Sequence, residues 1–120
     1  MCANFQPITQ AQASRFTNQQ LSFDFKDEIY PGYEAPLLFA ELLSNTRGDP
    51  AEWRSAIFGI IPTWAKDTSF AKHTYNARSE TVADKPSFKH VWYNNQFALI
   101  PVQTIYEPKY INGKAHRYGI

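Results

Sequence analysis

The single cysteine of the chain, Cys2, directly follows Met1. Methionine aminopeptidase removes an initiator methionine when the next residue is small, so we expect the mature chain to begin with Cys2. That residue would carry an α-amine that titrates near pH ~8 and a thiol that titrates near ~8.5. An amine condenses with an aldehyde to a Schiff base, and a thiolate attacks a carbonyl carbon. The alternative is that Cys2 is a small apolar residue without a chemical role.

A second candidate segment contains Asn76 and Arg78, two positions apart. On an extended segment such residues face the same way. The Asn76 amide offers both a donor and an acceptor, and the rigid guanidinium fork of Arg78 suits a phosphate group. The segment from Asn76 to Glu80 can also be the start of a helix, with a capping side chain and a surface ion pair.

Glu107 is the third candidate, because it lies within the largely apolar segment Ile105 to Pro108. A carboxyl group on a mostly buried strand has a raised pKa and can act as a general acid or base. The alternative is that Glu107 points outward from an edge strand.

The remaining polar and aromatic candidates give weaker signals. His73, His90 and His116 have no metal-ligand spacing with one another or with Cys2, so we expect no metal site. The sequence indicates no organic cofactor either. Trp64 is either a core residue or a platform for stacking a base.

Composition indicates one folded domain. Of the 120 residues, 43% are hydrophobic and 16% are aromatic. A single cysteine excludes an intrachain disulfide and fits a cytoplasmic protein. We expect neither a signal peptide nor a membrane span. Residues 1–60 hold four Lys/Arg and seven Asp/Glu, whereas residues 61–120 hold eight and four. The second half is therefore the one expected to face a polyanion.

In the first half, Thr9 is expected to cap a helix over residues 10–19. The other elements expected there are a strand over residues 21–25, a turn at Pro31-Gly32, a strand or helix over 37–43, a loop over 45–50 and a buried strand over 53–61.

In the second half we expect a loop over residues 63–74, short helices over 79–83 and 86–93, and strands over 97–101 and 104–111. Asn112-Gly113 predicts a type I′ hairpin turn leading into a strand that starts at Lys114. Because the sequence stops inside that strand, which would leave an exposed edge, we expect the natural protein to extend beyond Ile120.

Five segments in this order resemble the SRAP family, the SOS response-associated peptidases that include sensors of abasic sites. They are Cys2, Ile60-Ile61-Pro62-Thr63-Trp64-Ala65-Lys66, Asn76-Ala77-Arg78-Ser79-Glu80-Thr81-Val82 with Lys85-Pro86-Ser87-Phe88, Leu99-Ile100-Pro101 and Tyr106-Glu107. The resemblance covers essentially all of residues 1–120, as a single SRAP-like domain. The family domain is longer, so this one is expected to be incomplete at its C-terminus.

The resemblance implies a DNA-damage protein that binds single-stranded DNA and crosslinks to abasic sites. The ring-opened sugar aldehyde would condense with the Cys2 amine, and the thiol would then close a thiazolidine. Asn76 would orient the sugar or the amine, and Glu107 would act as acid or base. Arg78, Trp64 and Asn4 occupy positions implied to contact DNA. The family label also implies autocatalytic removal of N-terminal residues.

The chain departs from the family pattern at three places. Ala3-Asn4 replaces the family's usual Gly-Arg after the cysteine, and Pro108 replaces a tryptophan after Tyr-Glu. The family's catalytic histidine belongs to a motif further along, and nothing in the sequence promotes His116 to that role.

The resemblance further implies an α+β fold, with mostly antiparallel strands in a curved, barrel-like sheet and a few short helices. Two other functions remain open. Cys2 could serve a cysteine peptidase or amidohydrolase that acts on peptides, or the chain could be a non-catalytic, truncated remnant.

Overall fold

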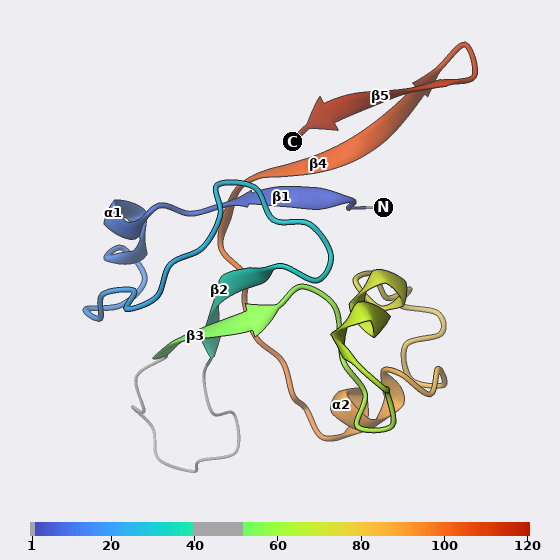
Figure 1. The fold of residues 1–120 in the computed structure, drawn as a ribbon, viewed down its shortest axis with the longest axis horizontal. Coiled ribbons are helices and arrows are strands. Elements are labelled where there is room, and N and C mark those ends of the chain that lie inside the picture. The colour runs from blue at the N-terminus through green and yellow to red at the C-terminus, as the bar shows by residue number, and fades with distance from the viewer. Residues whose placement is uncertain (1, 40–51) are drawn as a thin grey trace.

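The computed structural model describes residues 2–39 and 52–120, and its strands form two antiparallel sheets (Figure 1). The first sheet has the strand order β1-β4-β5 and the second pairs β2 with β3. The elements are β1 (Asn4–Pro7), α1 (Gln10–Ala13), β2 (Glu34–Phe39), β3 (Glu52–Ile57), the 3₁₀ helix η1 (Thr68–His73), α2 (Lys89–Tyr93), β4 (Val102–Ile111) and β5 (Lys114–Gly119).

The expected capping residue of the first helix is confirmed, but the helix is shorter than predicted. The Thr9 side chain accepts from the Gln12 backbone, and the Gln12 side chain accepts from the Thr9 backbone, which completes a capping box. Ala13 is the only buried residue of α1. Without a longer apolar stripe to bury, the chain leaves the helix, and Phe16 packs edge-on against Trp53.

The predicted C-terminal hairpin is confirmed. Asn112 has a φ of 51° and Gly113 a φ of 76°. Both values are positive, as a type I′ turn requires, and Ile111 pairs with Lys114. The preceding strand β4 begins two residues earlier than the predicted strand over 104–111. In the strand order β1-β4-β5, β5 is an outer strand, and every one of its residues is exposed.

The predicted strand over 53–61 is shorter in the structure, because the ladder of β3 with β2 ends at Ile57. Gly59 has a φ of 119°, which bends the chain away from the sheet. The Gly59 backbone packs so closely on η1 that a Cβ atom there would lie 2.6 Å from the Ala71 carbonyl oxygen. The predicted turn at Pro31-Gly32 is confirmed, with the Tyr33 N–H donating to the Tyr30 carbonyl.

Several other predicted elements are absent or differ in extent. Residues 21–25 form no strand, although burial does alternate along them, because their backbone joins no ladder. Residues 97–101 contribute one bridge, between Leu38 and Leu99, and residues 63–74 include the helix η1. Residues 79–83 form only turns, and the helix expected over 86–93 starts after Pro86, at Lys89. The predictions for 40–43 and 45–50 lie outside the described residues.

The core consists of two small clusters of buried residues. One joins α1 to the second sheet through Ile8, Ala13, Leu21, Leu38 and Trp53. The other is formed by Phe5 of β1, Ile29 and Ala35, and Phe58 and Val102 pack against it. Together they fasten β1 and the start of β2 to the loop after β3.

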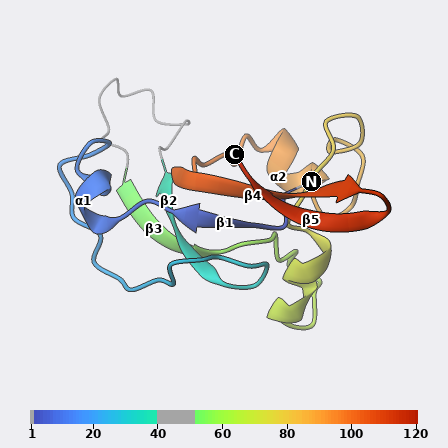
Figure 2. The same cartoon turned by 90° about the horizontal axis from the view of Figure 1, so that it is seen from above.

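The α+β class with mostly antiparallel strands is confirmed, but the barrel-like closure is wrong for the part of the chain described. The two sheets stay separate, and the β4–β5 hairpin extends away from β2 and β3 (Figures 1 and 2). Closure fails because β5 pairs only with β4 within residues 2–39 and 52–120. Among the described residues, no helix is long and apolar enough to span a membrane.

Candidate active site around Cys2

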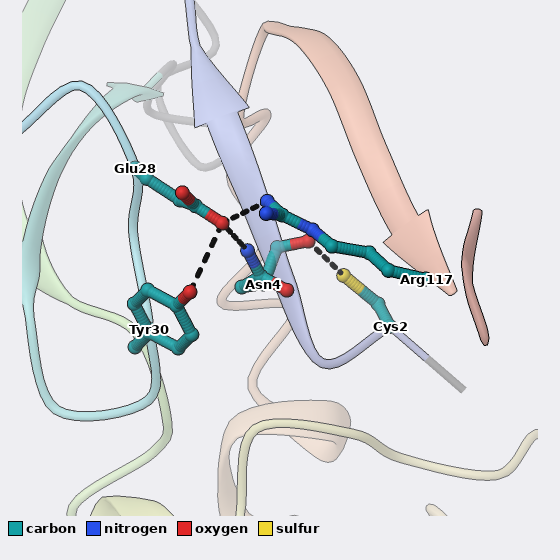
Figure 3. Close-up of polar contacts among 5 residues, drawn as sticks. All are labelled: Cys2, Asn4, Glu28, Tyr30 and Arg117. Carbon is teal, nitrogen blue, oxygen red and sulfur yellow. Dashed lines mark hydrogen bonds and ion pairs between the residues drawn. The ribbon is translucent and has the colours of Figure 1, made fainter. Parts of the chain in front are cut away.

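Cys2 lies two residues before the start of β1, where the chain joins the first sheet. The Ala3 N–H donates to the Tyr106 carbonyl at 3.2 Å, and Asn4 pairs with Tyr106 across the ladder. Glu107 therefore lies next to the point where the Cys2 end of the chain meets β4. The Cys2 sulfur is 3.5 Å from the Asn4 carbonyl oxygen, within reach of a thiol hydrogen bond (Figure 3).

The thiol of Cys2 has a pKa above its ordinary value. Partial burial is the main cause, because it disfavours the charged thiolate, and the negative charge of Glu107 raises the pKa further. A backbone hydrogen bond with Asn4 acts in the opposite direction. The protonated thiol is therefore the resting form at neutral pH, and it must lose its proton as the sulfur adds to a carbon atom.

The Asn76 side chain contacts Cys2 from a distant part of the sequence. Its amide nitrogen donates to the Cys2 backbone carbonyl at 2.9 Å across a separation of 74 residues. A donor on this carbonyl restrains the peptide plane that follows Cys2 and so holds the Cys2 backbone in place.

Two contacts hold the segment that carries Asn76. The Thr74 hydroxyl donates to the Ile60 carbonyl at 2.6 Å, and Thr74 is buried. The Tyr75 ring packs on Phe58 at 5.7 Å, and Phe58 packs on Phe5 of β1 at 5.0 Å. This row of rings links the segment to the strand that follows Cys2.

A cavity of about 290 Å³ adjoins this end of the sheet. Its walls come from the start of β1, from β4 and from β5, and they comprise Ala3, Asn4, Tyr106, Glu107, Pro108, Ala115, His116 and Arg117. The cavity is thus lined by both Glu107 and His116, a histidine that belongs to no recognised sequence motif.

The structure places the three residues expected to contact DNA in different surroundings. Arg78 is exposed. Trp64 is 58% exposed and lines a hollow of about 390 Å³ with residues 65–67, 69 and 70. Asn4 is only 5% exposed and its amide donates to Glu28. Neither Arg78 nor Trp64 lines the cavity beside Cys2.

Sequence reasoning missed a polar network that joins two residues of this cavity wall, Asn4 and Arg117, to Glu28 (Figure 3). Asn4 and Arg117 both donate to Oε1 of Glu28, and the Tyr30 hydroxyl donates to it at 3.1 Å. The Arg117 guanidinium also lies over the Tyr106 ring, 3.7 Å from its centroid. This geometry allows a cation–π contact. No spacing could have revealed this network, since 24 and 89 residues separate Glu28 from Asn4 and Arg117.

The sequence of this chain matches a known family. The profile of the SOS response associated peptidase (SRAP) family matches residues 1–120. The chain therefore belongs to the SRAP family, which confirms the resemblance inferred from its motifs.

Curated relatives agree with this membership. Abasic site processing protein YoaM of Bacillus subtilis (strain 168) is 35% identical over 71 residues, which is 59% of this chain and 29% of the relative. Abasic site processing protein YoqW of Bacillus phage SPbeta is 37% identical over a region with the same coverage. The matched region thus spans less than a third of these relatives.

A crystal structure of a protein from Bordetella bronchiseptica superposes with a TM-score of 0.74 and is 27% identical in sequence. The superposition covers 95% of this chain and 54% of the Bordetella protein. The arrangement of the two sheets is therefore shared with a longer protein.

Proposed function

We propose that the chain forms a covalent adduct with abasic sites in single-stranded DNA through Cys2. The observation that carries the proposal is the hydrogen bond from Asn76 to the Cys2 carbonyl, beside the carboxylate of Glu107. It joins an amine and thiol, an orienting amide and a carboxylate at one place. The names of the curated relatives, abasic site processing proteins, support the same substrate.

The chemistry requires Cys2 to be the first residue. Its α-amine adds to the C1′ aldehyde of the ring-opened sugar, and the carbinolamine loses water to give an imine. The thiol sulfur then bonds to the imine carbon, while the π electrons of the C=N bond and one proton go to the nitrogen. The net reaction joins amine, thiol and aldehyde into a thiazolidine with release of one water and no change of oxidation state.

Each residue in this proposal has a role that follows from its position. Asn76 holds the Cys2 backbone so that amine and sulfur reach the same carbon, as near-attack geometry requires. Glu107 accepts and returns the protons that amine addition and water loss transfer. Arg78 and Trp64, both exposed, would bind phosphate and stack a base on the approaching strand.

Ring closure on an imine demands less of the Cys2 thiol than peptide hydrolysis does, because an imine is more electrophilic than an amide carbonyl. A cysteine peptidase generally depends on a thiolate with a lowered pKa, whereas the Cys2 pKa is raised. Autocatalytic removal of residues before Cys2, if the methionine persists, would be a slow, single event. It would share the carboxylate of Glu107 as the proton acceptor.

The proposal is tested by the intact mass of the protein before and after incubation with a single-stranded oligonucleotide that carries one abasic site. We expect a chain lacking Met1 and a heat-stable adduct whose mass equals protein plus DNA minus one water. Cys2→Ala should abolish the adduct. Cys2→Ser should still form an imine through its α-amine, and borohydride should reduce that imine to a stable secondary amine.

Two results would count against the proposal. An adduct that forms equally with Cys2→Ala would assign the crosslink to another nucleophile. A processed chain that forms no adduct at all would favour the non-catalytic alternative. The same oligonucleotide annealed to its complement tests the preference for single strands.

A further inference from the structure

One carboxylate oxygen of Glu28 receives hydrogen bonds from three separate segments: Asn4 of β1, Tyr30 of the loop before β2 and Arg117 of β5 (Figure 3). We propose that Glu28 is a positioning residue for Cys2, which acts by fixing Asn4 and the β4–β5 hairpin around it. This inference rests on the proposed function in that it assigns a new residue to the same site.

The link from Glu28 to the thiol passes through Asn4. The Asn4 side chain is tied to Glu28, and its backbone carbonyl is the group that the Cys2 sulfur contacts at 3.5 Å. Because Asn4 is only 5% exposed, its amide has little access to water as an alternative partner. Replacing the Glu28 carboxylate with a weaker amide acceptor would therefore loosen Asn4, and with it the segment that carries Cys2.

Arg117 provides a second connection, from Glu28 to strand β5 in the wall of the cavity. Arg117 belongs to β5, whose residues are all exposed, and it crosses from there to Glu28 (Figure 3). Its guanidinium also covers the Tyr106 ring, next to Glu107. Glu28 thus ties the hairpin that carries Glu107 to the loop before β2, in addition to the β1–β4 ladder that brings Glu107 close to Cys2.

The three hydrogen bonds distinguish this pair from an ordinary surface ion pair. The side chain of Arg117 is 52% exposed and that of Glu28 is 34% exposed. An isolated ion pair with this much exposure contributes little. A carboxylate that also accepts from a buried amide and a hydroxyl has a defined orientation. The chain offers a matched control in Glu52, which pairs with Arg54 on β3 at similar exposure and belongs to the other sheet.

The closing experiment compares wild type, Glu28→Gln, Asn4→Ser and the control Glu52→Gln. Cys2 is the only cysteine, so its alkylation by iodoacetamide across pH reports the thiol without interference. A second assay, on abasic DNA, measures the ratio of imine trapped by borohydride to heat-stable adduct. Thermal unfolding checks that each variant is folded.

We expect Glu28→Gln and Asn4→Ser to lower the pH midpoint of alkylation, because a loosened Cys2 is less buried. Both should accumulate imine and close the ring on the order of 10- to 100-fold more slowly, as a misplaced nucleophile does. Glu52→Gln should match wild type in both assays.

The Asn4→Ser variant separates positioning from simple electrostatics, since it keeps the charge of Glu28. The proposal would be overturned if only Glu28→Gln shifted the pH midpoint of alkylation, or if neither variant shifted it. If wild type forms no adduct, the proposed function fails, while the alkylation midpoints still decide whether Glu28 positions Cys2. If Glu28→Gln does not fold, Asn4→Ser alone gives the same decision.

Discussion

Replacing Asn76 with alanine is the most direct test of how the site is held together. The substitution removes the 2.9 Å hydrogen bond from the Asn76 amide to the Cys2 carbonyl, in partly buried surroundings. A neutral hydrogen bond contributes about 1 kcal/mol net, and leaving a buried partner unsatisfied costs about 1–3 kcal/mol. If this loss appears fully in the transition state, adduct formation slows by about 5- to 150-fold.

The assay is single-turnover adduct formation on an abasic oligonucleotide, measured with excess protein at several concentrations. We expect the maximal rate to fall rather than the concentration dependence to change, because Asn76 acts on Cys2 and not on the DNA backbone. Asn94→Ala is a matched control. The Asn94 amide also donates to a backbone carbonyl, that of His90, at 2.7 Å, but on an exposed helix end.

The reasoning would be refuted if Asn76→Ala reacted as fast as Asn94→Ala while both stayed folded. A fall in DNA affinity with an unchanged maximal rate would instead place Asn76 at the DNA backbone. Asn76→Asp should be slower than Asn76→Ala, since a carboxylate facing the Cys2 carbonyl repels it.

Three further predictions concern pH and the backbone. Because the Cys2 pKa is raised in the folded chain, the unfolded chain loses its thiol proton first. The urea midpoint of unfolding should therefore fall as pH rises through about 8.5. The fall should be smaller in Glu107→Gln, and Cys2→Ser should lose the part of it that comes from the thiol. Gly59→Ala would push a Cβ atom to 2.6 Å from the Ala71 carbonyl oxygen. We expect this overpacking to cost about 1–3 kcal/mol in urea unfolding and to weaken adduct formation. Gly113→Ala has open space around its Cβ, but the backbone φ of Gly113 is 76°. That substitution should cost about 1 kcal/mol in urea unfolding and leave the adduct rate unchanged.

Local chemistry explains which elements the sequence predicts correctly. The Thr9 cap, the Pro31-Gly32 turn and the Asn112-Gly113 turn each depend on the conformational preferences of one or two residues. The strand over 21–25 was predicted from alternating side chains, and burial there does alternate. The strand is absent because a ladder requires a partner backbone, which periodicity does not supply.

For the site, the sequence by itself determined the reactive groups and the family, through Cys2, the Asn76 motif and Glu107. Only the tertiary structure decided how these groups are held. The contact of Asn76 with Cys2, the burial of Asn4 and the Glu28 network join residues 24 to 89 positions apart. Such contacts depend on which strands pair and which side chains are then enclosed, and no local preference of the chain encodes that.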